Sequence, residues 1–84
     1  MHSNGVRQKL ARIYFENGTN HEVLISEYDS IRMVVQGNYM EAVYRGKRIY
    51  YNADQDNERL SPNKNFEGIQ GNVVMFVKKG TKNV

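Results

Sequence analysis

The chain of 84 residues contains no cysteine, which excludes disulfide bonds and thiolate metal sites. Its two histidines, His2 and His21, give little material for a structural metal site. A domain of this size buries only roughly 60–65% of the surface that its unfolded chain exposes, so its stability is marginal without further help. Because neither disulfides nor a metal is expected to supply that stability, oligomerisation is the remaining route, and we expect a homo-oligomer.

Long apolar runs are also missing. The longest, Val73–Val77, has the length of a strand and not that of a signal-peptide core or a membrane span. Together with the absence of cysteine, this predicts a soluble cytoplasmic protein with no membrane partner. The net charge of +3 favours an anionic partner weakly, although such a charge also serves solubility alone.

The residue sets that carry catalysis or bind cofactors are not recognisable. There is no cysteine nucleophile, and no serine and carboxylate stand at a spacing from His21 that would indicate a catalytic triad. The segment Gly68–Gly71 is too short for a phosphate loop and lacks its lysine and hydroxyl residue. The acidic stretch 54–58 lacks the spacing and the central glycine of a calcium loop. We therefore expect no enzyme, no catalytic residue, no metal and no cofactor.

The N-terminal part has strand character. Residues 1–8 lack periodicity and are predicted to form a flexible arm. Alternation predicts a strand over Leu10–Glu16, and Asn17-Gly18 is a strong hairpin turn signal before a second short strand, Glu22–Ile25.

A helix is predicted over residues 26–36. Ser26 is a suitable N-cap whose hydroxyl can accept from the amide of Asp29, and Gly37 can supply the left-handed C′ residue. The β-branched run Ile31–Val35 is also compatible with a strand. The two end signals favour the helix.

Three more strands follow. They are predicted at Tyr39–Arg45, at Arg48–Asn52 after a turn at Gly46-Lys47, and at Asn72–Lys79 before a tail, 80–84. The last strand is apolar on both faces, which places it centrally with the helix on one side. The chain is thus predicted to be a single α+β domain over residues 1–84, with about five mostly antiparallel strands and one helix packed on one face. An Sm- or SH3-like β-barrel is the alternative.

One hairpin has the composition of a binding site. Arginine interleaved with tyrosine is suited to contact phosphates and to stack on bases. The alternative is that the tyrosines pack on the sheet while the cations remain in solvent. The candidate ligand- or partner-binding residues are Tyr39, Tyr44, Arg45, Lys47, Arg48 and Lys64.

Four segments, in order, resemble a small family of unknown function found mainly in bacteriophages and other mobile elements. Gln36–Val43 is similar to its helix end and Gly-Tyr-Ile-Glu-like strand, and Asn52 with Asp54–Leu60 to its acidic turn. Pro62-Asn63-Lys64 stands where Pro-Asn-Arg is expected, and Ile69–Val74 resembles the closing Ile-x-Gly strand.

This resemblance covers about Arg12–Lys79. Asn38 separates the glycine from the tyrosine, and Lys64 replaces an arginine, which weakens any bidentate anion contact there. The resemblance implies an accessory protein of a phage or mobile element, and it implies no activity.

A second resemblance, to the Sm-like RNA chaperone family Hfq, covers about half of the chain. Tyr14–Gly18, Tyr28-Asp29 and Val43–Lys47 are similar to segments of that family. The histidine of the last segment and a preceding helix are missing. This resemblance implies that Ile31–Val35 is a strand of a barrel.

Small size, expected oligomerisation and the phage-family resemblance lead to one functional hypothesis. We expect a non-enzymatic inhibitor of a bacterial defence system, active in the host cytoplasm, that binds a host defence protein or an anionic nucleotide signal stoichiometrically. The alternative is an RNA- or DNA-binding protein that uses the basic hairpin. A structural role in the virion is a third possibility.

Overall fold

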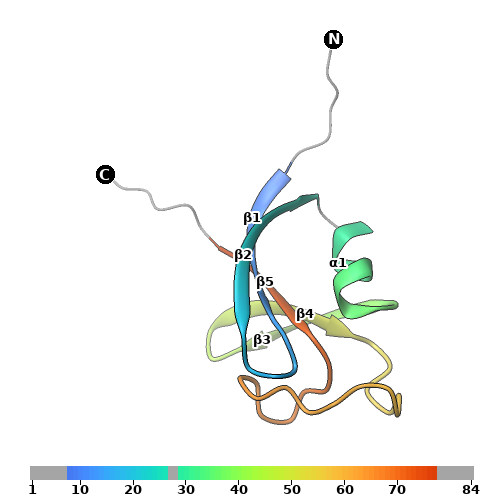
Figure 1. Cartoon of the computed structure of the whole chain (residues 1–84). Helices are drawn as coiled ribbons and strands as arrows, with labels where there is room; N and C mark the ends of the chain where they lie inside the picture. The colour runs from blue at the N-terminus through green and yellow to red at the C-terminus, as the bar shows by residue number, and fades with distance from the viewer. Residues whose placement is uncertain (1–7, 27–28, 78–84) are drawn as a thin grey trace.

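The computed structural model describes residues 8–26 and 29–77, which form one helix and a five-stranded antiparallel sheet (Figure 1). The sheet order is β2-β1-β5-β4-β3, so the last strand is central, as its two apolar faces predicted. The sheet is open, so the predicted α+β fold is confirmed and the barrel alternative is not the fold observed. The elements are β1 (Gln8–Tyr14), β2 (Asn20–Ser26), α1 (Asp29–Val35), β3 (Tyr39–Tyr44), β4 (Lys47–Asn52) and β5 (Val73–Phe76).

Several predicted boundaries were wrong by a few residues. Gln8 belongs to β1 and not to the arm, and β2 begins at Asn20 because the whole hairpin pairs from Tyr14 outward. The second turn is formed by Arg45 and Gly46, with φ of 52° and 83°, and not by Gly46 and Lys47. Two consecutive residues with positive φ are typical of a type I′ turn, whose twist matches the flanking strands. The rest of the predicted arm and the tail, 80–84, lie outside the described residues.

The helix begins later than predicted. Its first residue is Asp29, while Ser26 is the last residue of β2. The Ser26 hydroxyl lies 3.1 Å from the hydroxyl of Ser30, so Ser26 does not cap the amide of Asp29 as predicted. Ile31 and Val35 are buried on the sheet, and this burial overrides the strand propensity of the β-branched run.

The end of the helix was predicted one residue late. Gln36, with φ of 65°, is the left-handed residue, and Gly37 follows it. The Gly37 amide donates to the carbonyl of Arg32 at 3.0 Å, the long bond of a Schellman motif. A Cβ on Gly37 would lie 3.1 Å from Nδ2 of Asn52, so glycine is needed here for space beside that amide.

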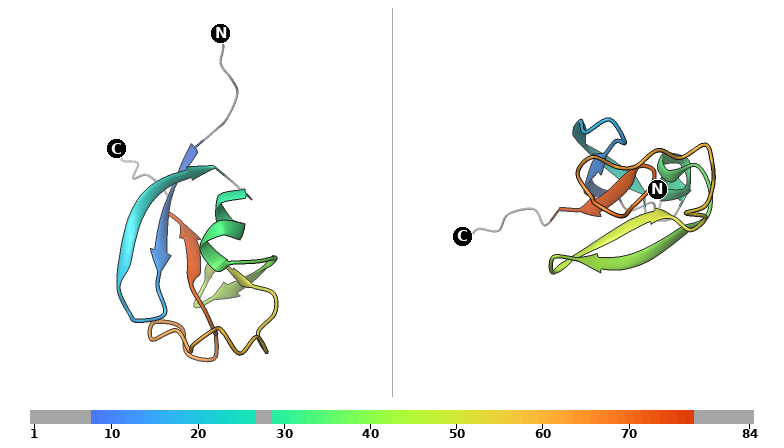
Figure 2. Two further views of the ribbon diagram at one scale, coloured as in Figure 1. Left: turned by 45° about the vertical axis from the view of Figure 1, so that its right-hand side comes forward. Right: turned by 90° about the horizontal axis from the view of Figure 1, so that it is seen from below.

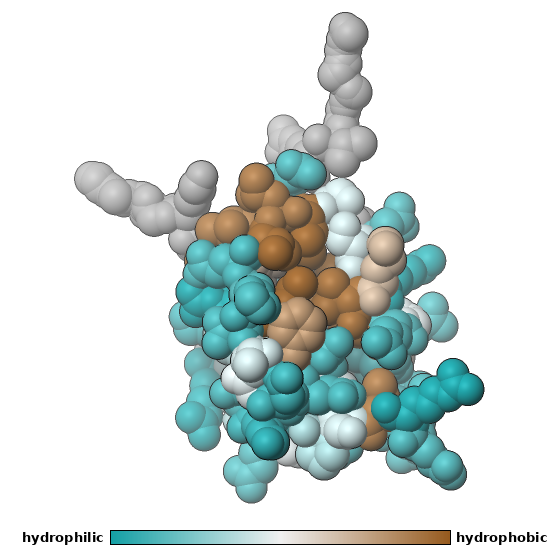
Figure 3. Space-filling view, viewed as in Figure 1, coloured by the Kyte–Doolittle hydropathy of each residue, from teal (hydrophilic) through white to brown (hydrophobic). Residues whose placement is uncertain are grey.

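The sheet has a core on each face. Val74 packs with Ile31 and Val35 under α1, whereas its neighbour Val73 packs on the opposite face with Ile49 and Phe66. Figure 2 shows α1 on one side of the sheet and the β3–β4 hairpin running across the direction of β1 and β2. Figure 3 shows apolar surface over β2 and toward α1, where half-buried side chains complete the first core.

Asparagine side chains hold the long connection 53–72 in place. Asn63 is buried and donates to the carbonyls of Tyr14 at 3.0 Å and Gly71 at 2.9 Å. Asn72 donates to the carbonyl of Val34 at 3.0 Å. The side chains of Asn63 and Asn72 therefore contribute to the fold by satisfying backbone carbonyls of other segments.

Candidate functional site

The hydrogen-bond ladder between β4 and β5 stops early. Its rungs are Tyr50 with Val74 and Tyr51 with Val73, although both strands continue beyond them. The Val77 amide donates to the carbonyl of Leu10, so alternate β5 residues bond to β1 and the backbone of Phe76 faces β4. In this register the next pairs would be Ile49 with Met75 and Arg48 with Phe76, of which the second would exchange hydrogen bonds, and both are missing from the ladder.

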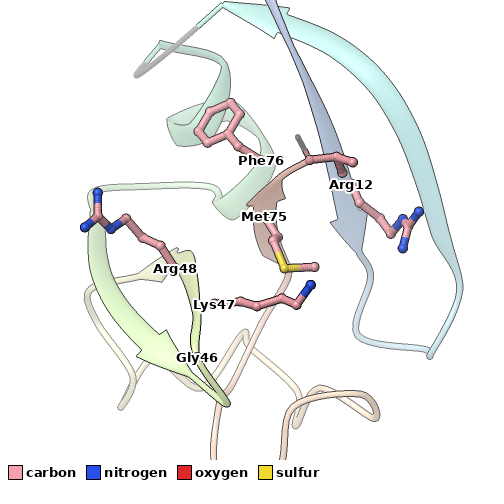
Figure 4. A pocket seen from close by; sticks show the side chains of 7 residues that line it. Arg12, Gly46, Lys47, Arg48, Met75 and Phe76 are labelled. Atoms are coloured by element: carbon pink, nitrogen blue, oxygen red, sulfur yellow. The ribbon is translucent and has the colours of Figure 1, made fainter. Parts of the chain in front are cut away.

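A cleft opens where this rung is missing, and we call it the seam cleft (Figure 4). Its volume is about 510 Å³. Figure 4 shows Lys47 extending toward Met75 and Arg12, while the guanidinium of Arg48 points away from them. The cleft is lined by Arg12, Gly46, Lys47, Arg48, Met75, Phe76 and Val77.

The three cations of the cleft differ in how far their charge is balanced. Arg12 pairs with Glu22 across β1 and β2, and Nε of Arg48 lies 2.7 Å from a carboxylate oxygen of Glu41. Within residues 8–26 and 29–77, Lys47 forms no ion pair. Lys47 is therefore the cation with the most charge left for a ligand.

Arg12 keeps its own charge and retains a free donor. Its hydrogen bond to Glu22 raises the pKa of Arg12 above the ordinary value, and Tyr14 acts in the same direction. Its Nε is buried and has no hydrogen-bond partner in the part of the chain that the structure describes. Arg12 is also one of the residues that line the seam cleft.

A second hollow of about 330 Å³ adjoins the seam cleft and shares Arg12, Lys47 and Met75 with it. Phe66 is one of the residues that line it, and its ring lies 4.9 Å from that of Tyr44 in an edge-to-face contact. The guanidinium carbon of Arg45 lies 5.4 Å from the centre of the Tyr44 ring. Arg45 and Tyr44 thus form a cation–π contact beside this hollow.

The six predicted site residues fall into separate places. Tyr44, Arg45 and Lys47 come together around the two hollows, and Arg48 lines the seam cleft but is paired. Tyr39 lies on the helix side of the sheet, with its ring 5.7 Å from that of Tyr50.

Lys64 lies beside the β1–β2 turn, where its amide donates to the carbonyl of Glu16 at 3.3 Å. It lines neither hollow. Lys64 and Tyr39 therefore lie apart from the hairpin cations. Their positions depend on how their segments pack over the sheet, and no local sequence pattern determines that packing.

The residues that sequence reasoning missed are Arg12, Asn65 and Met75. Alternation along β1 puts Arg12 on the face of Leu10 and Tyr14, opposite the buried Ala11 and Ile13. The missing information was that β5 lies between β1 and β4 and brings Arg12 toward Lys47.

The described residues carry no cluster of three or more histidine, cysteine or acidic side chains that could hold a metal ion. None of their helices is long and apolar enough to cross a membrane. The arrangement is suited to hold an anion, because Arg12 and Lys47 bring two cations from different strands to a cleft with an apolar wall. Comparisons with protein-family models, curated proteins and solved structures found no match.

Proposed function

We propose that this chain is a non-enzymatic accessory protein of a phage or mobile element that inhibits a bacterial defence by capturing an anionic nucleotide in the seam cleft. The observation that carries the binding part is that Arg12 and Lys47 line one cleft and that Lys47 forms no ion pair within residues 8–26 and 29–77. The source and the inhibitory role rest on the phage-family resemblance.

Phosphate is the group that best fits the cleft. The ammonium of Lys47 on β4 and the guanidinium of Arg12 on β1, the strands on either side of β5, can supply charge-assisted donors to phosphate oxygens. Met75 and Phe76 supply apolar wall, and the volume lies in the range of small-ligand sites. Arg48 adds only a weaker attraction, because Glu41 already balances its charge.

The base would stack on Arg45. Tyr44 contacts that guanidinium on one side and the Phe66 ring in an edge-to-face arrangement, so it supports Arg45. A guanidinium plane stacks on any nucleobase, so this contact favours no single base. The proposal therefore puts phosphate in the seam cleft and the base over the adjoining hollow.

Thermal unfolding with a panel of linear and cyclic nucleotides tests the proposal. A ligand at 100 times its dissociation constant stabilises the native state by ~2.7 kcal/mol. We expect a rise in Tm that is lost in Lys47→Ala and kept in the matched control Lys64→Ala, because Lys64 lies outside both hollows.

Two outcomes would overturn nucleotide capture. No rise in Tm with any nucleotide would leave a host protein as the captured species. Binding of mixed oligonucleotides that weakens steeply with salt, without any response to mononucleotides, would support the RNA- or DNA-binding alternative.

A further inference from the structure

The edge strand β3 presents unpaired backbone groups. The two-residue turn makes Tyr44 and Lys47 a hydrogen-bonded pair, so every second β3 residue from Tyr44 bonds to β4. The amides and carbonyls of the intervening residues, Glu41 and Val43, consequently point away from the sheet. A strand in this state is a template for another strand.

This edge lacks the usual protection against pairing. Residues 39–44 contain no proline and no lysine, and their one charge, Glu41, is paired with Arg48 at 2.7 Å. Two large apolar side chains of β3 are exposed, Val43 by 69% and Met40 by 44%, and they lie on opposite faces of the strand. Covering both at once requires a partner strand alongside β3 and not a partner on one face.

We infer that β3 pairs antiparallel with β3 of a second copy of this chain, about a twofold axis at Ala42. In this register Glu41 hydrogen-bonds with Val43 of the second copy through the backbone, and the two Ala42 residues face each other across the axis. Met40 then lies opposite Tyr44 of the second copy, which covers its exposed side chain.

The register follows from charge. Pairing centred on Glu41 would place two carboxylates directly opposite each other, which is destabilising. Pairing centred on Ala42 places each Glu41 opposite a valine instead.

Pairing of β3 with β3 is favoured over head-to-tail pairing of β2 with β3, because only the first forms a closed assembly. The other edge of the sheet is β2, and pairing β2 with β3 of a second copy would leave free edges at both ends and continue into a filament. Pairing of β3 with itself uses the same surface twice and stops at a dimer. The partner's Met40 would also border Tyr44 and hence the hollow beside the seam cleft.

Sedimentation equilibrium over a wide range of concentration tests the dimer. We expect a dimer for the native chain and a monomer for Val43→Lys, because a charge on the edge opposes pairing. Met33→Lys is the matched control: Met33 is 80% exposed on α1, so its replacement should leave the dimer intact. Circular dichroism confirms that both variants are folded.

A cross-link tests the register. The chain has no cysteine, so Ala42→Cys introduces a single thiol. Directly opposed Cβ atoms lie ~4.5–5.5 Å apart in such a pair, close to the separation that a disulfide bridges. Oxidation should link two copies through position 42 and not in the control Leu24→Cys on β2.

The inference is overturned by a monomer at every concentration. It is also overturned by a dimer that persists in Val43→Lys and cross-links through Leu24→Cys. Neither result bears on nucleotide capture, which is measured by ligand-dependent stability.

Discussion

Asn52 donates a hydrogen bond of 2.8 Å from its side-chain amide to the backbone carbonyl of Val35, and thereby fastens β4 to the end of α1. Its side-chain oxygen accepts from the amide of Asp54 at 2.7 Å. The side chain is 3% exposed, so water cannot replace these partners. A helix of seven residues depends on such contacts, because most of its terminal carbonyls lack partners within the helix.

Asn52→Ala should lower the free energy of unfolding by roughly 2 kcal/mol, because it leaves the Val35 carbonyl and the Asp54 amide without their buried partners. Urea denaturation measures the change. The control Asn20→Ala removes an exposed asparagine of β2 and should change stability by less than about 0.5 kcal/mol. Equal effects of the two substitutions would contradict this role of Asn52.

Gln36→Gly should stabilise the protein by about 0.5–1 kcal/mol, since glycine adopts the left-handed conformation of this residue without a steric penalty. Gly37→Ala should destabilise it, because the new Cβ would press against Asn52. Thermal unfolding of both variants checks the order. A loss of stability in Gln36→Gly would show that the helix does not end in this motif.

Gly71→Ala should destabilise more than Gly68→Ala. Both glycines have positive φ, 92° and 89°, so both substitutions strain the backbone by about 1 kcal/mol or more. Only at Gly71 would the Cβ also meet a neighbour, Cδ2 of Leu60 at 3.2 Å. Chemical denaturation of the two variants separates backbone strain from the contact with Leu60. Equal losses of stability in Gly71→Ala and Gly68→Ala would refute the close approach of Leu60.

Glu22→Gln should tighten nucleotide binding about two- to fivefold, the scale of one exposed ion pair. The substitution removes the carboxylate that balances Arg12 and leaves the guanidinium available to phosphate. Titration calorimetry measures the affinity. Glu58→Gln makes the same change in net charge in the connection 53–72, away from both hollows, and should have a smaller effect. Equal gains in nucleotide affinity for Glu22→Gln and Glu58→Gln would mean that the change in net charge alone is responsible.

Much of the fold could be predicted because its signals are local. Alternation located the strands, and the two apolar faces of Val73 and Val74 placed β5 at the centre of the sheet. The ends of α1 were harder, because Gln36 holds a left-handed conformation that its residue type does not favour. Burial of Ile31 and Val35 stabilises the helix between these ends.

The site was only partly predictable. The hairpin brings Tyr44, Arg45 and Lys47 together through local pairing, which sequence can indicate. Arg12 enters through a crossover, and the seam cleft exists because two strands diverge after Tyr50 and Val74. Neither the crossover nor the divergence leaves a pattern in the residues of one strand.

Backbone amide NMR shifts during nucleotide titration test the central claim most directly. Saturable shifts should concentrate at Lys47, Arg48 and Phe76, where the ladder is broken, and be absent around Lys64. The same titration of Lys47→Ala should show much weaker saturation. Shifts centred on Lys64, or an unchanged spectrum at high nucleotide concentration, would contradict anion capture in the seam cleft.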